Sequence, residues 1–258
     1  MPDKPIVPNV AQTFYDRIAP QYDQFYQDWD ETVRTEAQFL QGLFAELGFD
    51  ASARILDCAC GIGTQAIGLA ALGYAVTGSD LSAGELAEAE RRAAERNVSL
   101  RFEQADFRAL ADVFYDSYDI VIAMDNALPH MLTAADLQTA AQSIAGRLRE
   151  GGVFVASIRD YDRMLAEKPA YSAPYVHKTD RGQRVLFQTW DWHGEHYRFI
   201  QYIINDTGTA EISKFECEYR AVRRAELTAL LLQAGCREVL WRMPAETGFY
   251  QPIVIARK

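Results

Sequence analysis

The chain has 258 residues, 49% of them apolar and 24% charged, a balance typical of a folded globular protein. Its 36 acidic residues outnumber 26 basic ones, giving a net charge of −10. Because neutralising phosphates needs clustered Lys and Arg, we expect neither a nucleic acid nor an acidic membrane surface as partner. No apolar run approaches the roughly 18 residues of a transmembrane helix. The first residues also lack the apolar core of a signal peptide.

The cysteines and histidines do not predict a metal site. Cys58 and Cys60 lie in a glycine-containing loop, and no second Cys or His pair follows at the spacing of a zinc site. Cysteines so placed do not form a disulfide framework either. We therefore expect a cytoplasmic protein with reduced thiols and no metal.

The N-terminal region divides into a tail and a helical run. Residues 1–12 are rich in proline and polar residues and predict a flexible tail. From Phe14 to Leu47 apolar residues return at helical spacing, and Gly48 ends the run. Aromatic residues crowd the first half of this run. Packing against a core is one explanation for them, and a functional one is given below.

From residue 53 onward the pattern alternates between strand and helix. Strands are predicted at 54–58, 74–79, 100–104, 119–124 and 153–158, with helices at 65–72, 83–96 and 134–148. Such alternation predicts crossover units and a parallel sheet. After Arg159 three strands follow without a helix between them, at 184–192, 196–205 and 210–222. A helix at 224–234 and strands at 238–242 and 252–256 complete the chain.

The fold class predicted is therefore α/β. We expect a Rossmann-like, mostly parallel seven-stranded sheet with helices on both faces. An antiparallel three-stranded meander is inserted after the fifth strand.

A glycine loop lies between the first predicted strand and the helix that follows it. Gly61, Gly63 and Ala66 match the pattern G-x-G-x-x-A, in which glycines allow a tight turn and a close approach of the ligand to the backbone. Asp80 ends the next strand, where a carboxylate would accept hydrogen bonds from ribose hydroxyls. The pattern alone fits NAD, so an NAD-dependent oxidoreductase is one reading.

Two acidic residues favour a different nucleotide. Asp57 precedes Gly61, and a carboxylate there would repel a pyrophosphate but would suit an α-ammonium group. Asp106, followed by Phe107, ends the third strand, where an acid could accept from an adenine amino group beside an aromatic ring. A nucleoside with an amino-acid tail and no phosphate, S-adenosylmethionine, fits both positions.

With these motifs the chain resembles the class I S-adenosylmethionine-dependent methyltransferases, most closely the glycine N-methyltransferase and glycine/sarcosine N-methyltransferase group. The resemblance rests on ILDCACGIGT at 55–64, VTGSDLS at 76–82, Ala105-Asp106-Phe107, MDNALPH at 124–130 and SIRDYD at 157–162. It covers nearly the whole chain. Asp125 departs from the family pattern, which usually has a small residue at that position.

The resemblance implies a set of cofactor-binding residues. An N-terminal segment would close over the cofactor and bring aromatic faces near the sulfonium, which they attract. Arg34 would hold the methionine carboxylate. The full set implied is Tyr22, Tyr26, Trp29, Arg34, Ala59, Gly61, Asp80, Leu81, Asp106, Phe107, Met124 and His130.

For the acceptor, the resemblance implies Arg159 as the residue that binds a carboxylate, with Asn126 beside it and Tyr219 at the substrate. These residues would position a small-molecule amine, such as glycine or sarcosine, and no catalytic base is identified. A salt bridge from Arg159 to Asp160, Asp162 or another neighbouring acid is the structural alternative. For the function as a whole, an O- or C-methyltransferase of another small metabolite and a relative that binds the cofactor without turnover stay open.

The same resemblance divides the chain into four parts. Residues 1–47 would form the tail and helical lid, and 48–160 the S-adenosylmethionine-binding core. Residues 161–222 would form the inserted meander, which would serve the substrate side or a contact in a homo-oligomer. Residues 223–258 would return to the core sheet.

Overall fold

A seven-stranded sheet forms the centre of the protein in the computed structural model, which describes residues 10–180 and 182–258. Its order is β10-β11-β5-β4-β1-β2-β3; β1 to β5 pair in parallel, whereas β11 is antiparallel to both neighbours. The strands are β1 (Arg54–Asp57), β2 (Ala75–Asp80), β3 (Arg101–Gln104), β4 (Tyr118–Ala123), β5 (Leu148–Ser157), β10 (Glu238–Arg242) and β11 (Ile253–Arg257).

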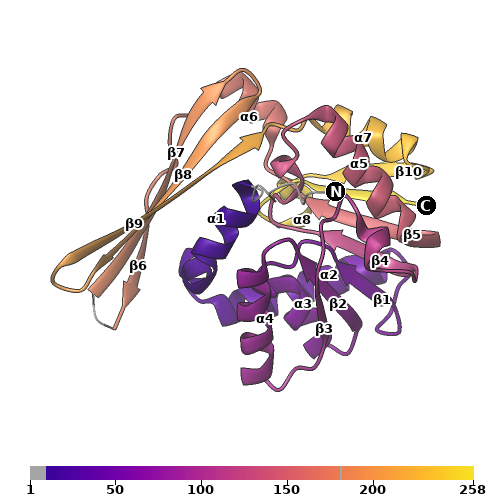
Figure 1. Ribbon diagram of the computed structural model, residues 1–258, viewed down its shortest axis with the longest axis horizontal. Coiled ribbons are helices and arrows are strands. Elements are labelled where there is room, and N and C mark those ends of the chain that lie inside the picture. The colour runs from indigo at the N-terminus through magenta and orange to yellow at the C-terminus, as the bar shows by residue number, and fades with distance from the viewer. Residues whose placement is uncertain (1–9, 181) are drawn as a thin grey trace, which may run out of the picture.

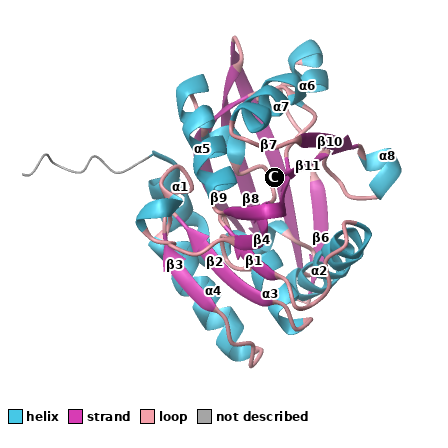
Figure 2. Cartoon of the chain, turned by 90° about the vertical axis from the view of Figure 1, so that its right-hand side faces the viewer, coloured by secondary structure: helices cyan, strands magenta, loops and turns pink. Residues whose placement is uncertain are grey.

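Helices cover both faces of this sheet (Figure 2). Successive side chains of a strand point to opposite faces, and β4 shows the consequence. Ile120 and Ile122 pack in one cluster with α2 (Trp29–Glu46) and α3 (Thr64–Ala71). Val121 and Ala123 pack in another with α5 (Ala134–Gly146) and α7 (Arg224–Gln233). Two buried faces explain the continuous apolar runs of the strands and confirm the predicted fold class.

The N-terminal region is less regular than its apolar spacing predicts. It forms α1 (Val10–Ile18), the 3₁₀ helix η1 (Ala19–Phe25) and then α2. Pro20 lies at the start of η1 and removes a donor, while Asp28 caps α2 by accepting from the Glu31 N–H at 2.9 Å. The predicted tail is wrong for residues 10–12, which begin α1. Its remaining residues, 1–9, lie outside the described part of the chain.

The inserted sheet has four antiparallel strands, one more than predicted (Figure 1). They are β6 (Tyr175–Thr179), β7 (Gly182–His193), β8 (His196–Asp206) and β9 (Ala210–Arg220), preceded by α6 (Tyr161–Glu167). The strand missed is β6, because the short sequence YVHKT is largely exposed and lacks an alternating apolar face. α1 packs against β9 and also against α4 (Ala83–Glu95), so it connects the inserted sheet to the core.

Two features of the C-terminal half position the site. β5 begins at Leu148, earlier than predicted, because the chain pairs with β4 as soon as α5 ends. The short helix α8 (Pro244–Thr247), which the sequence did not predict, places Phe249, Tyr250 and Gln251 beside the carboxyl edge of the sheet. The remaining short helices are η2 (Leu110–Asp112) and η3 (Leu128–His130). None of the helices described is long and apolar enough to cross a membrane.

Candidate functional site

The glycine loop turns sharply between β1 and α3. Gly61 and Gly63 have φ values of 52° and 89°, a region that residues with a Cβ rarely adopt. A Cβ on Gly63 would also lie 2.7 Å from the Ile67 side chain. The turn directs the Gly61 N–H to Asp80 Oδ2 at 2.9 Å, so the loop is joined to the end of β2.

A cavity lies between this loop, the carboxyl ends of β1, β2 and β4, and the N-terminal helices. It measures about 90 Å³, less than the 300–1,000 Å³ of a typical small-molecule site. Ten predicted cofactor residues line it, namely Tyr22, Tyr26, Ala59, Gly61, Asp80, Leu81, Asp106, Phe107, Met124 and His130. The structure thus places these ten residues around one cavity, and their contacts with a cofactor stay a prediction. We call it the cofactor cavity.

The charge of the cofactor cavity distinguishes between nucleotides. Among the described residues that line it, none is Lys or Arg, whereas Asp80, Glu85, Asp106 and Asp125 are acidic. Both carboxyl oxygens of Glu85 are buried and lack a partner in the described part of the chain, as does Oδ2 of the nearby Asp57. Burial raises the pKa of all three carboxyl groups, Asp57, Asp80 and Glu85. These groups fit hydroxyl and ammonium donors, and not a pyrophosphate.

Asp106 lines the cofactor cavity but is already engaged. Arg108 Nε donates to Oδ1 at 3.1 Å and to Oδ2 at 3.0 Å, and Arg108 Nη2 donates to Oδ2 at 2.6 Å. The Arg108 backbone N–H also donates to Oδ1. This ion pair fixes the carboxylate beside Phe107 and leaves fewer lone pairs for a ligand than the sequence suggested.

Trp29 and Arg34 do not line the cofactor cavity, contrary to the expectation for both. Trp29 is buried and donates to Thr64 Oγ1 at 3.0 Å. Arg34 is 59% exposed and forms an ion pair with Glu31. At 3.6 residues per turn, Glu36 lies on nearly the opposite side of α2 from Arg34, and Glu36 is the one that faces inward.

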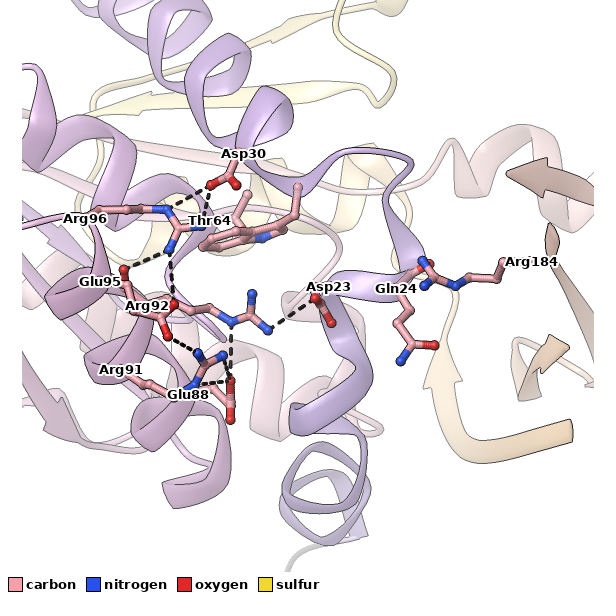
Figure 3. Close-up of polar contacts among 11 residues, drawn as sticks. Asp23, Gln24, Asp30, Thr64, Glu88, Arg91, Arg92, Glu95, Arg96 and Arg184 are labelled. Atoms are coloured by element: carbon pink, nitrogen blue, oxygen red, sulfur yellow. Dashed lines mark hydrogen bonds and ion pairs between the residues drawn. The ribbon is translucent and has the colours of Figure 1, made fainter. Parts of the chain in front are cut away.

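Trp29 instead belongs to a contact between α2 and α4. The guanidinium groups of Arg92 and Arg96 lie 4.7 Å and 4.6 Å from its ring centroids. Each arginine also reaches an acid of the N-terminal region, with Arg92 3.5 Å from Asp23 and Arg96 paired with Asp30 (Figure 3). These ion pairs fasten the segment that covers the cofactor cavity.

A second cavity, of about 660 Å³, adjoins the first. It lies between the N-terminal helices, the inner face of the inserted sheet and the segment after α8. All three predicted acceptor residues, Asn126, Arg159 and Tyr219, line it. Its volume falls in the range of small-molecule sites, and we call it the acceptor cavity. Tyr15, Tyr22, Tyr26 and Asp125 line both cavities, so the two spaces meet at these residues.

Arg159 has no acidic partner among the described residues. Its guanidinium donates to Gln188 Oε1 at 3.0 Å and to the Tyr197 hydroxyl at 3.3 Å. The rings of Trp190, Phe199 and Tyr219 surround it at 5.3–5.8 Å. The predicted alternative, a salt bridge to Asp160 or Asp162, is not formed.

Those two acids pair with another residue. Arg224 is 2.6 Å from Asp160 and 3.1 Å from Asp162. Asp160 additionally caps α6. Within the described part of the chain, no acid therefore pairs with the positive charge of Arg159, which lines the acceptor cavity.

Asn126 presents a donor next to this charge. Its Oδ1 accepts from the Arg159 backbone N–H at 3.1 Å and from the Tyr161 hydroxyl at 2.9 Å. These two donors fix the orientation of the amide. Its Nδ2 is buried without a partner in the described chain. Both Asp125 and Asn126 have positive φ, 57° and 72°, a backbone strain that clusters at functional sites.

Tyr219 lies in an aromatic group at the boundary of the two cavities. The Tyr15 hydroxyl is 2.8 Å from His130 Nε2 and 3.4 Å from the Tyr219 hydroxyl. Burial, with the charge of Arg159, lowers the pKa of His130 to about 3. The imidazole is therefore neutral near pH 7, and it shares a hydrogen bond with the Tyr15 hydroxyl.

A pair of carboxyl groups, Glu36 and Asp125, lines the same cavity as Arg159, and the sequence did not predict the pairing. The Gln65 amide donates to Glu36 Oε2 at 2.6 Å and to Asp125 Oδ2 at 2.8 Å. The Tyr250 hydroxyl donates to Asp125 Oδ1 at 2.5 Å. Burial and the neighbouring Asp125 raise the pKa of Glu36 to about 9, and burial also raises the pKa of Asp125. The sequence does contain a signal for each: Glu36 is a polar residue on the buried face of α2, and Asp125 departs from the family pattern.

The comparisons with known proteins agree with this arrangement. A family model described as a methyltransferase domain matches residues 55–152. The glycine/sarcosine N-methyltransferase of Parasynechococcus marenigrum (strain WH8102) is 28% identical over 233 residues, which cover 88% of this chain and 77% of that protein.

Solved structures share the fold. CalS10, an amino pentose methyltransferase from Micromonospora echinaspora bound to S-adenosylmethionine, has a TM-score of 0.71 at 20% identity over 87% of this chain and 91% of its own. KedS8, a sugar N-methyltransferase from Streptoalloteichus sp ATCC 53650, has a TM-score of 0.74 at 20% identity over 92% of each chain. The chain thus contains a matched methyltransferase domain at residues 55–152 and is similar, over most of its length, to S-adenosylmethionine-dependent methyltransferases.

Proposed function

We propose that the protein methylates the nitrogen of a small-molecule amine that carries a carboxylate, with glycine, sarcosine and related amino acids as the acceptor class. The observation that carries this proposal is the environment of the Arg159 guanidinium. A guanidinium held in place by Gln188 and Tyr197, with no acid to neutralise it in the described chain, suits a bidentate carboxylate. The free Nδ2 of Asn126 lies in the same cavity and would donate to that carboxylate.

The similar protein from Parasynechococcus marenigrum supports this choice through its name, glycine/sarcosine N-methyltransferase. The acceptor cavity, however, has about 660 Å³, far more than glycine fills. Larger amino acids are therefore the second candidate. The sugar N-methyltransferase of the same fold also acts on an acceptor larger than glycine.

In this proposal the residues of the cofactor cavity orient the methyl donor. Asp80 would accept from the ribose hydroxyls and Phe107 would flank the adenine. Tyr22 and Tyr26 would place their ring faces near the sulfonium. S-adenosylmethionine supplies an electrophilic methyl group and leaves as a neutral thioether.

The remaining contribution of the protein to catalysis is to position the acceptor. The acceptor nitrogen must lie in line with the methyl carbon and the sulfur, and such alignment contributes about 7–11 kcal/mol to catalysis. Arg159 and Asn126 would fix the carboxylate end, and the aromatic residues around Tyr219 would exclude water.

Formation of S-adenosylhomocysteine with paired acceptors tests the proposal. Each amino acid, from glycine and sarcosine to larger ones, is compared with its methyl ester, which keeps the amine and loses the carboxylate charge. We expect turnover of at least one free acid and a tenfold or greater loss for its ester. Equal turnover of acid and ester, or turnover only of acceptors without a carboxylate, would refute it.

A further inference from the structure

Asp125 stands where the two cavities meet. Its carboxyl group lines both of them, so it is next to the region where the acceptor must approach the methyl group. In the described chain neither Asp125 nor Glu36 has a cationic partner within ion-pair distance; their recorded partners are the Gln65 amide and the Tyr250 hydroxyl. A buried carboxylate without a cation is costly unless a ligand supplies one.

A second observation points to a ligand at this place. Gln251, next to Tyr250 in the chain, is 8% exposed and lines the acceptor cavity, and its Oε1 has no partner in the described residues. The Nδ2 of Asn126 is equally unpartnered in the same cavity. The unpartnered acceptor, Gln251 Oε1, and the unpartnered donor, Asn126 Nδ2, would both be satisfied by a ligand that has N–H groups and acceptor oxygens.

The two carboxyl groups cannot both carry a charge at low cost, because they share the Gln65 amide in a buried site. Asp125 accepts from both Gln65 and Tyr250, whereas Glu36 accepts from Gln65. The two donors favour the ionised form of Asp125, and the pair thus keeps its proton on Glu36.

We propose that Asp125 binds the ammonium group of the acceptor and removes its proton before methyl transfer. An N–H bond of the ammonium breaks, an O–H bond forms on the carboxylate, and the nitrogen lone pair becomes free for attack on the methyl carbon. After transfer the nitrogen is again positively charged, and the proton on Asp125 passes to solvent. This inference rests on the proposed function and deepens it: it names the group that holds the amine end of an acceptor whose carboxylate Arg159 binds.

Binding of two cofactor analogues tests this without any acceptor. Sinefungin bears an ammonium group in place of the methyl-bearing sulfonium, whereas S-adenosylhomocysteine is a neutral thioether there. The ammonium of sinefungin would thus enter the space next to Asp125. Calorimetry on the full chain should show that Asp125→Asn weakens the affinity for sinefungin at least tenfold and changes the affinity for S-adenosylhomocysteine less than threefold.

Glu36→Gln is the matched control for the acid pair. Because Glu36 holds the proton near pH 7, an amide in its place should preserve the preference for sinefungin. Loss of the preference in Glu36→Gln but not in Asp125→Asn would overturn the assignment. An equal loss for both ligands in Asp125→Asn would also overturn it, since Asp125 would then serve the methionine end.

Tyr250→Phe gives an independent test that keeps the carboxylate. The titratable groups that face Asp125 are Glu36 from α2, Tyr22 and Tyr26 from the N-terminal region, Asp57 from β1 and Tyr250. Removing the Tyr250 donor raises the pKa of Asp125, so Asp125 becomes protonated at a higher pH. As the pH is lowered, the preference for sinefungin should therefore be lost at a higher pH in Tyr250→Phe than in the wild type. An unchanged midpoint would contradict the proposal.

These results are independent of the acceptor class. If methyl esters are turned over as well as free acids, the role of Arg159 fails while the sinefungin result still decides the role of Asp125. If sinefungin and S-adenosylhomocysteine respond alike but esters are rejected, the proposed function stands and this inference fails.

Discussion

Asn126 Oδ1 accepts a hydrogen bond from the backbone N–H of Arg159 at 3.1 Å. The bond connects the loop after β4 to the loop after β5, two neighbouring parallel strands whose carboxyl ends meet at the same edge of the sheet. It also fixes the orientation of the amide: Oδ1 accepts two hydrogen bonds, and Nδ2 has no partner among residues 10–180 and 182–258. A guanidinium and an amide donor thereby face one cavity.

Replacing this amide tests the donor directly. In Asn126→Asp a carboxylate oxygen takes the place of Nδ2, so the donor is lost and a negative charge faces the acceptor carboxylate. We expect the KM for the acceptor to rise at least tenfold, since hydrogen bonds to charged groups contribute about 1.5–3 kcal/mol. The affinity for S-adenosylmethionine, measured by calorimetry, should stay within threefold. A normal KM would show that the amide does not touch the acceptor.

Asp80 is expected to hold the cofactor ribose. Asp80→Ala removes a carboxylate that lines the cofactor cavity and joins β2 to the Gly61 turn. Calorimetry should show S-adenosylmethionine binding weakened at least tenfold. Asp112→Ala, at an exposed acid of η2, is the matched control and should bind normally. Unchanged affinity in Asp80→Ala would remove the nucleotide assignment of this loop.

The N-terminal segment should open when the cofactor exchanges. The cofactor cavity is too small for the ligand while Tyr22 and Tyr26 occupy their present positions. Movement of the segment must therefore precede binding, as in other enzymes with lids. Trypsin cleavage after the exposed Arg17 should be fast without S-adenosylmethionine and at least fivefold slower with it. Cleavage after Arg237, 75% exposed and distant from both cavities, provides the internal reference. Equal slowing at both positions would argue against a lid.

The buried acid pair should make stability depend on pH. Glu36 has a folded-state pKa of about 9, above its unfolded value, so the folded state binds the extra proton between pH 4.5 and 9. By linkage the stability that Glu36 contributes falls as the pH rises through that window. Glu36→Gln removes this dependence. The melting temperature of the variant minus that of the wild type should therefore become more positive from pH 5 to pH 9. A constant difference over that range would contradict the assignment.

The parts of the structure that the sequence predicts are those with strong local signals. Gly61 and Gly63 belong to a turn whose backbone needs positive φ, Asp80 ends the next strand, and the strands of the core are continuous apolar runs. Asn126 and Arg159, which the sequence predicts at the acceptor, follow two such strands, so their placement at the sheet edge follows from the topology.

What the sequence could not predict depends on contacts between distant segments. Arg34 was expected in the site, yet the rotation of α2 fixed by its buried face turns Glu36 inward instead. Tyr250 reaches Asp125 because α8 redirects the chain. A helix of four residues is too short to produce a periodic apolar pattern in the sequence. Gln65 joins Glu36 to Asp125 across elements far apart in the chain, which spacing alone does not reveal.

The most direct test of carboxylate recognition combines one substitution with one chemical change in the acceptor. The value of kcat/KM is measured for an amino acid and for its methyl ester, in the wild type and in Arg159→Lys, which keeps the charge but loses the bidentate fork. We predict that the wild type prefers the free acid at least tenfold and that most of this preference disappears in Arg159→Lys, while S-adenosylmethionine binds both proteins alike. The same acid-to-ester ratio in both proteins would contradict a role for Arg159 in binding the carboxylate.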